Sequence, residues 1–236
     1  THFDAPPEPV PAAERAALVC DRRHAVVVRI DLGLIDDEAP AGERLVPELE
    51  RRIGLAEHGI GGLFGSSATD LWAVGSYRQG GGTLGLVLHS TGDGIWTQQK
   101  FEPDRGTLYL GSLTSVWASS KSDVYAGVGY NIVGGYAGIY RCSGRGTDWR
   151  RETDTTNAPN IYAMWGSGPT DVWAVGFVKD GSNYNGIVLR SKGDGKWAPD
   201  PDLPASKLVG LPLYGVWGSR YGDVYIVGQS GVILHK

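Results

Sequence analysis

A fourfold internal repeat constrains the fold of this chain more than any other feature of its sequence. In each copy an aromatic residue, a small residue and a serine precede an aspartate; the copies are Phe64–Asp70, Trp117–Asp123, Trp165–Asp171 and Trp217–Asp223. The aromatic residue and the aspartate are six positions apart in all four copies, which start 53, 48 and 52 residues apart. Self-similarity at this period indicates supersecondary units that stack and bury their faces against one another.

Each repeat predicts four short strands. After the aspartate comes an apolar residue and then a second aromatic residue, as in DVW at 171–173. A run rich in β-branched residues and leucine follows, such as GIVLRS at 186–191, and in three copies a polar turn then leads to a tryptophan. Gly, Ser and Asp favour tight turns, whereas β-branched and aromatic residues favour strands. Four strands in a unit of this length are typical of a propeller blade.

We therefore predict an all-β chain that forms a small β-propeller of four four-stranded blades. The blades correspond to residues of about 58–110, 111–158, 159–210 and 211–236. The fourth repeat lacks a last strand, and RHAVVVRID at 23–31 is an apolar strand candidate with no repeat of its own. We expect 23–31 to complete the last blade, so that 23–236 forms one domain. Residues 1–22 are rich in Pro and Ala and read as an arm.

Residues that recur in every unit are poor candidates for a unique active site. We assign a structural role to the eight tryptophans, all of which fall in repeat positions, and to the four turn aspartates: Trp72, Trp96, Trp117, Trp149, Trp165, Trp173, Trp197, Trp217, Asp70, Asp123, Asp171 and Asp223. His89 and His235 share a third-strand position with Arg141 and Arg190, which also suggests blade geometry. Neither a Cys/His cluster nor a G-x-S-x-G or P-loop motif is present, so we predict no metal, no cofactor and no catalytic residues.

The two cysteines, Cys20 and Cys142, show no spacing typical of a zinc or redox motif. In an oxidising compartment they could form a disulfide that closes a long loop. Two separate thiols remain the alternative, because the sequence does not fix the geometry that a disulfide requires.

Residues with a specific function are expected where the four repeats differ in sequence. Three repeats carry a nine-residue insert between their second and third strands, at 76–84, 129–137 and 177–185, where propeller topology would place them on one rim. Tyrosine, asparagine and glycine suit adaptable recognition. The candidate ligand-binding residues are Tyr77, Arg78, Gln79, Tyr130, Asn131, Tyr136, Asn183, Tyr184 and Asn185. The alternative is that these inserts only extend their hairpins outward.

The repeats resemble those of a family of secreted or surface-attached bacterial proteins. WGSGPTDVWAVG at 165–176, followed by GIVLRSKGDGKW at 186–197, is similar to that family's WGS-x-x-DVWAVG…GxILHxxDGxW pattern, and the likeness covers about 58–236. The resemblance implies a propeller-like fold outside the cytoplasm and little about activity. The S-x-G-D-G-x-W piece is also distantly similar to the Asp-box of sialidase-type propellers, a motif that marks a fold and is usually remote from chemistry.

These observations favour a non-catalytic binding module, outside the cell or on its surface, for a glycan or a protein partner. A structural subunit of a surface assembly is the first alternative, with the N-terminal strand and arm making the contact between self-associating subunits. A glycosidase or lyase is the second, although no acid/base carboxylate pair is assignable. The net charge of −4, without a basic block, argues against nucleic acid, and no apolar run reaches the length of a membrane span.

Overall fold

The structure is a computed structural model. It describes strands at 18–21, 24–27 and 29–31, and residues 59–79, 82–101, 111–129, 137–143, 148–153, 158–219 and 222–236. These residues form β-sheets joined by turns, together with the short 3-10 helices η3 (Ala205–Lys207) and η4 (Gln229–Gly231). The described part of the chain contains no α-helix. The predicted all-β fold class is therefore confirmed for these residues.

Each repeat forms one antiparallel sheet in which consecutive strands are neighbours. The first sheet contains β4 (Gly59–Ser67), β5 (Asp70–Gln79), β6 (Gly82–Ser90) and β7 (Ile95–Gln99). The second contains β8 (Ser112–Ser120), β9 (Asp123–Gly129), β10 (Gly138–Ser143) and β11 (Trp149–Arg151). The third contains β12 (Asn160–Gly168), β13 (Asp171–Asp180), β14 (Asn183–Ser191) and β15 (Ala198–Pro199). The fourth contains β16 (Leu213–Gly218), β17 (Val224–Gly228) and β18 (Ile233–His235).

The described strands of the N-terminal apolar segment, 24–27 and 29–31, do not pair with the fourth sheet. Strand β2 (His24–Val27) forms a hairpin with β1 (Leu18–Asp21), and β3 (Arg29–Asp31) runs parallel to β7 on the outer edge of the first sheet. An apolar strand fits any open sheet edge, and β7 is far closer along the chain than β18, so pairing there closes a shorter loop. The structure thus differs from the prediction that 23–31 completes the last sheet.

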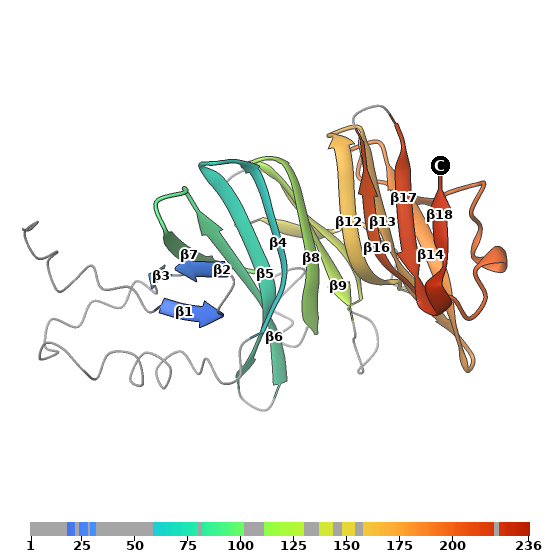
Figure 1. Cartoon of the computed structure of the whole chain (residues 1–236), viewed down its shortest axis with the longest axis horizontal. Coiled ribbons are helices and arrows are strands. Elements are labelled where there is room, and N and C mark those ends of the chain that lie inside the picture. The colour runs from blue at the N-terminus through green and yellow to red at the C-terminus, as the bar shows by residue number, and fades with distance from the viewer. Residues whose placement is uncertain are drawn as a thin grey trace, which may run out of the picture.

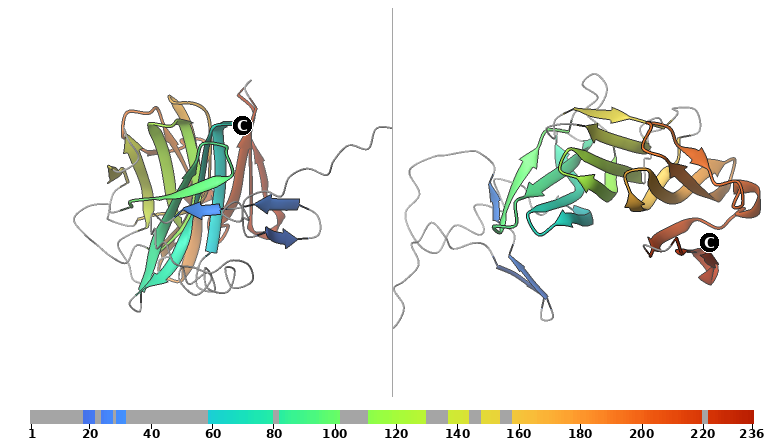
Figure 2. Two further views of the ribbon diagram at one scale, coloured as in Figure 1. Left: turned by 90° about the vertical axis from the view of Figure 1, so that its left-hand side faces the viewer. Right: turned by 90° about the horizontal axis from the view of Figure 1, so that it is seen from above.

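The four sheets follow one another along an arc (Figures 1 and 2). Their first strands lie on its inner side, where β4 contacts β8, β8 contacts β12 and β12 contacts β16. The face of one sheet packs on the next, so the core is divided into layers between successive sheets rather than gathered in one centre. This arrangement is what repeated units that cannot bury their own faces are expected to adopt.

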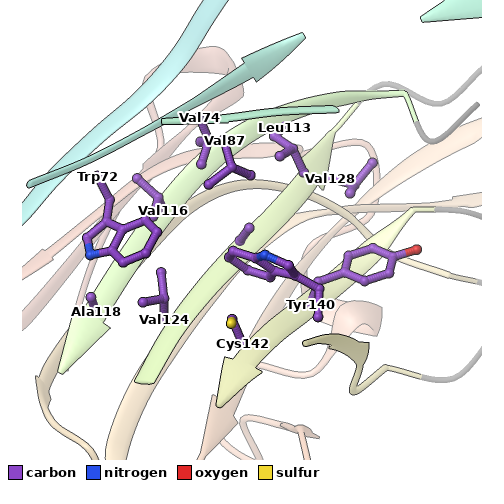
Figure 3. Close-up of a cluster of buried hydrophobic side chains, with 12 residues drawn as sticks. Trp72, Val74, Val87, Leu113, Val116, Ala118, Val124, Val128, Tyr140 and Cys142 are labelled. Carbon is purple, nitrogen blue, oxygen red and sulfur yellow. The ribbon is translucent and has the colours of Figure 1, made fainter. Parts of the chain in front are cut away.

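Each layer of the core draws side chains from two successive sheets. Between the first and second sheets, Trp72, Val74 and Val87 face Leu113 and Val116, and all five are buried (Figure 3). Equivalent clusters lie between the second and third and between the third and fourth sheets. The tryptophans at the repeat positions are buried or half-buried, except Trp217, which is 62% exposed.

A glycine five residues after the turn aspartate lets the first two strands approach closely. A Cβ built on Gly75 or Gly176 would lie 1.8 Å from a carbonyl oxygen of the neighbouring strand, that of Gly59 or Asn160. The register of both strand pairs shifts just beyond this contact, as a β-bulge does. Close backbone approach therefore explains why the first and third repeats carry Gly at this position.

Candidate functional site

The turn aspartate of each repeat is held by a serine and by a residue of the third strand. The serine four positions earlier donates to Oδ2 of the aspartate in all four sheets, for example Ser167 to Asp171 at 2.7 Å. On Oδ1, His89 contacts Asp70 at 2.8 Å and Arg190 donates to Asp171 at 2.9 Å. We call this set of contacts the aspartate latch.

The same third-strand residue also lies against the aromatic residue of the second strand. Arg190 lies over the Trp173 ring, 4.1 Å from its centroid, and Trp173 Nε1 donates to Asp171 at 3.1 Å. The ring centroids of Tyr225 and His235 are 4.4 Å apart in a stacked arrangement. The latch therefore ties the first turn to the second and third strands within one sheet, which is a structural task repeated four times.

The latch lowers the pKa of Asp171. Burial alone would raise the pKa of Asp171, but hydrogen bonds from Ser167 and Arg190, together with the charge of Arg190, outweigh burial and hold this pKa below its ordinary value. The carboxylate is therefore committed to a fixed set of donors. In the second sheet, burial raises the pKa of Tyr125 above its usual range.

Two of the three inserts extend their hairpins as regular β-ladder. In the first sheet the β5–β6 pairing continues from Ser76 opposite Gly85 to Gln79 opposite Gly82. In the third sheet the β13–β14 pairing continues to Asp180 opposite Asn183. The simpler of the two interpretations of these inserts, an outward extension of the hairpins, therefore describes their backbone.

The structure does not bring the predicted binding residues of 76–84 and 177–185 together as one set. Tyr77 is half-buried beside a cluster on the first sheet, whereas Arg78 is exposed. Asn183 and Tyr184 are exposed on the third sheet, and Oδ1 of Asn185 accepts a hydrogen bond from the backbone N–H of Gly210.

The remaining predicted residues lie beyond what the structure describes. These are the side chain of Gln79 and the residues Tyr130, Asn131 and Tyr136 of the 129–137 insert. Cys142 is buried in β10, and the side chain of Cys20 is likewise outside the described residues, so the disulfide remains a prediction.

A strip of aromatic side chains runs along the hairpin rim from the third sheet to the fourth. Tyr184 packs edge-on against Phe177 with centroids 5.2 Å apart, and Phe177 lies 5.6 Å from Tyr162. Tyr162 in turn meets Tyr214 of β16 at 5.6 Å. Tyr184 and Tyr214 are about half exposed at the two ends of the strip, and Tyr214 donates a long hydrogen bond to Gln229. We call these four residues the rim aromatics.

Sequence reasoning identified only Tyr184 among the rim aromatics. Phe177 was included in an insert without being singled out, and Tyr162 and Tyr214 lie on first strands outside every insert. A signal was present, because these two tyrosines occupy one repeat position that is Gly61 and Thr114 in the first two copies. A residue that the repeated fold required would be expected in all four copies. An aromatic residue found in only two copies is therefore a candidate for recognition.

The opposite rim of the third sheet has an open depression of about 840 Å³, lined by Asp171, Arg190, Lys192, Asp194 and Lys196 among others. The charges of Asp171, Arg190 and Asp200 are already engaged. Arg190 belongs to the latch, and the fully buried carboxylate of Asp200 accepts hydrogen bonds from Lys236 at 2.6 Å. Lys192 and Lys196 also line the depression and are exposed, so it still presents positive charge.

Within the described ranges, no three His, Cys, Asp or Glu side chains are grouped so as to hold a metal ion. None of the helices described is long and apolar enough to cross a membrane. No protein-family model matches the chain, and its sequence has no significant match among curated proteins.

Proposed function

We propose that this protein is a non-catalytic binding module of the β-propeller type that acts outside the cytoplasm and recognises a glycan or a protein partner. The rim aromatics are the observation that carries this proposal. Exposed tyrosine rings supply a large, rigid contact area, and their hydroxyls add hydrogen bonds at little cost in conformational entropy.

The arrangement of the sheets supports the propeller part of this proposal. Four antiparallel meanders follow one another with their first strands on the inner side of an arc, as blades do. The second-to-third-strand hairpins then project from one rim, next to the connector that leads into the next sheet. In the third sheet this proximity is direct, because the backbone N–H of Gly186 donates to the carbonyl of Leu208 at 2.8 Å.

The latches support the non-catalytic part. Asp70, Asp171 and Asp223 each have a serine donor and a basic or imidazole partner in a repeated structural contact. A carboxylate whose donors fix the shape of a turn is poorly placed to exchange protons with a substrate.

The test compares rim variants on a glycan array and, in parallel, against purified cell-surface proteins by surface plasmon resonance. Tyr184→Ala and Tyr214→Ala should each weaken binding by about tenfold or more, as the loss of an aromatic anchor does. Tyr184→Phe and Tyr214→Phe are the matched controls, because each keeps the ring and removes only the hydroxyl. Binding that survives both alanine substitutions would contradict a role for the rim aromatics.

A further inference from the structure

The layers between sheets are built from the same repeat positions each time. The face that packs on the next sheet, here called the forward face, carries the second-strand aromatic residue and apolar residues of the second and third strands. On the first three sheets these side chains are at most 2% exposed: Trp72, Val74, Val87, Tyr125, Ile139, Trp173, Val175 and Val188. Contact with the following sheet is therefore what covers them.

The forward face of the fourth sheet has aromatic and apolar residues at the same repeat positions, but these residues are exposed. Tyr225 pairs with His235 as Trp173 pairs with Arg190, and Val227 pairs with Ile233 as Val175 pairs with Val188. Tyr225, Val227 and Ile233 are all exposed, and Ile233 reaches 70%. Grouped apolar exposure of this kind marks an interaction surface more often than isolated exposed residues do.

On the opposite face of the first sheet, the first strand β4 is exposed, whereas Ala73, Leu86, Leu88 and Trp96 of the same face form a buried cluster. Leu113, Ile161 and Leu213 share one first-strand position and are fully buried against the preceding sheet. In the first sheet this position is Ile60, which is 57% exposed, and Leu63 three residues later is 65% exposed. We call this surface of β4 the backward face.

One contact in the internal layers shows how the two faces fit. Trp117 lies over Gly166 and Trp165 lies over Gly218, so closely that a Cβ on either glycine would lie 2.6 or 2.5 Å from the indole. Trp217 occupies the equivalent position in the fourth sheet, and none of the sheets that the structure describes packs against it. In the first sheet, the atoms nearest to a Cβ on Gly65 all belong to that sheet. At the last sheet, Trp217 therefore has no glycine to pack on among the residues described. At the first sheet, Gly65 has no tryptophan packed on it.

We propose that the forward face of the fourth sheet binds the backward face of the first sheet in a second copy of this chain, with Trp217 seated on Gly65. The two surfaces do not meet within one molecule, because the first and last sheets lie at opposite ends of the arc (Figure 2). Ile60 and Leu63 of β4 are exposed at one end, and Tyr225, Val227 and Ile233 at the other. The contact is head-to-tail, so it closes into a ring or extends as a filament. It does not depend on the ligand-binding proposal, and it uses a different surface from the N-terminal strand.

Analytical ultracentrifugation of the full chain over a concentration series tests this contact. The wild type should associate, whereas Trp217→Arg and Leu63→Asp should each weaken association by about 100-fold, as expected for loss of a central anchor. Ile233→Arg repeats the forward-face test with a second exposed residue. Val209→Asp is the matched control, because Val209 is 55% exposed but lies in the connector between the third and fourth sheets, and it should associate like the wild type.

Mixing the two single variants distinguishes head-to-tail docking from every other mode. Trp217→Arg keeps an intact backward face and Leu63→Asp keeps an intact forward face, so an equimolar mixture should form dimers that grow no further. A wild type that stays monomeric throughout the series would overturn the proposal, including the case in which the ring closes within one chain. A mixture that remains monomeric, or a Val209→Asp variant as defective as the other two, would overturn it as well.

Discussion

The seating of a tryptophan on a glycine between successive sheets makes Gly166→Ala a sharp test of the layered core. Gly166 lies on β12, where a Cβ would be 2.6 Å from Cζ2 of Trp117 and 2.9 Å from the carbonyl oxygen of Asp171. The indole of Trp117 is itself enclosed, with 3% of the residue exposed, so it has little room to withdraw. One added methyl group must therefore push two sheets apart or tilt the indole.

Overpacking of this kind costs about 1–3 kcal/mol of the free energy of unfolding. We expect Gly166→Ala to fall in the upper half of that range, because one of the two contacts is with backbone. Gly168→Ala is the matched control on the same strand, since nothing lies within 4 Å of a Cβ there. That substitution should be neutral or stabilise by up to about 1 kcal/mol through the unfolded state.

The first layer of the core suggests a rescue. There Phe64 takes the position of Trp117, and it packs against the cluster that contains Ala118 in place of a glycine. Combining Trp117→Phe with Gly166→Ala should reproduce this smaller ring over the larger residue. We expect the double variant to be more stable than the sum of the two single losses by about 1–2 kcal/mol.

Urea denaturation followed by circular dichroism measures the wild type, the three single variants and the double variant under identical conditions. The midpoint should shift while the dependence on urea stays constant, as it does when only stability changes. If Gly166→Ala were as stable as Gly168→Ala, or if the two losses were simply additive in the double variant, the tryptophan and the glycine would not be energetically coupled.

Three further outcomes follow from contacts within and between sheets. Asp171→Asn should lower the free energy of unfolding at neutral pH. Because the pKa of Asp171 is lower in the folded state, its carboxylate stabilises the fold above pH 3.8, and the difference in stability from wild type should shrink as the pH falls below that value. Unfolding measured from pH 7 to pH 2.5 checks this. Gly176→Ala should cost more than about 3 kcal/mol, seen as lost folded yield, since its Cβ would lie 1.8 Å from a backbone oxygen. Trp197→Phe should cost about 1.5–3 kcal/mol in urea melts, because Trp197 Nε1 donates at 2.9 Å to the mostly buried Glu152 of the preceding sheet.

The repeat made the strand order predictable because its signals are local. The alternation of aromatic and apolar residues in DVWAVG at 171–176, and the turn residues before Asp171, act over a few positions and need no knowledge of distant contacts. The extension of β13 and β14 to Asp180 and Asn183 also follows from sequence, as the simpler of two interpretations of the insert.

The pairing of the N-terminal strand was not predictable in the same way. AVVVRI at 25–30 carries no information about which open edge it meets, and loop length favours the edge of β7 over that of β18. The rim aromatics were missed for a related reason. Tyr162 and Tyr214 come from different repeats, and their proximity to Phe177 depends on how neighbouring sheets pack rather than on any spacing along the chain.

The repeated sequence did not predict which residues are exposed at the two ends of the arc. Trp217 and Trp165 are each followed by Gly and Ser, and Ile60 has the same periodic position as Ile161. Nevertheless Trp217 and Ile60 are exposed, whereas Trp165 and Ile161 are not. Burial depends on whether a neighbouring sheet exists, and a repeated sequence encodes the position without encoding the neighbour.

The aspartate latches lie at the end of each sheet that holds the first and third turns, opposite the second-to-third-strand hairpins. The latch contacts that hold β13 against β14 near Trp173 are therefore remote from the hairpin tip at Gly181. A Cβ built on Gly181 would have no atom within 4 Å. This separation suits the protein as a display scaffold. Foreign peptides grafted into the tip at 180–183 would be presented beside the aromatic strip, while the latches keep the supporting sheet unchanged.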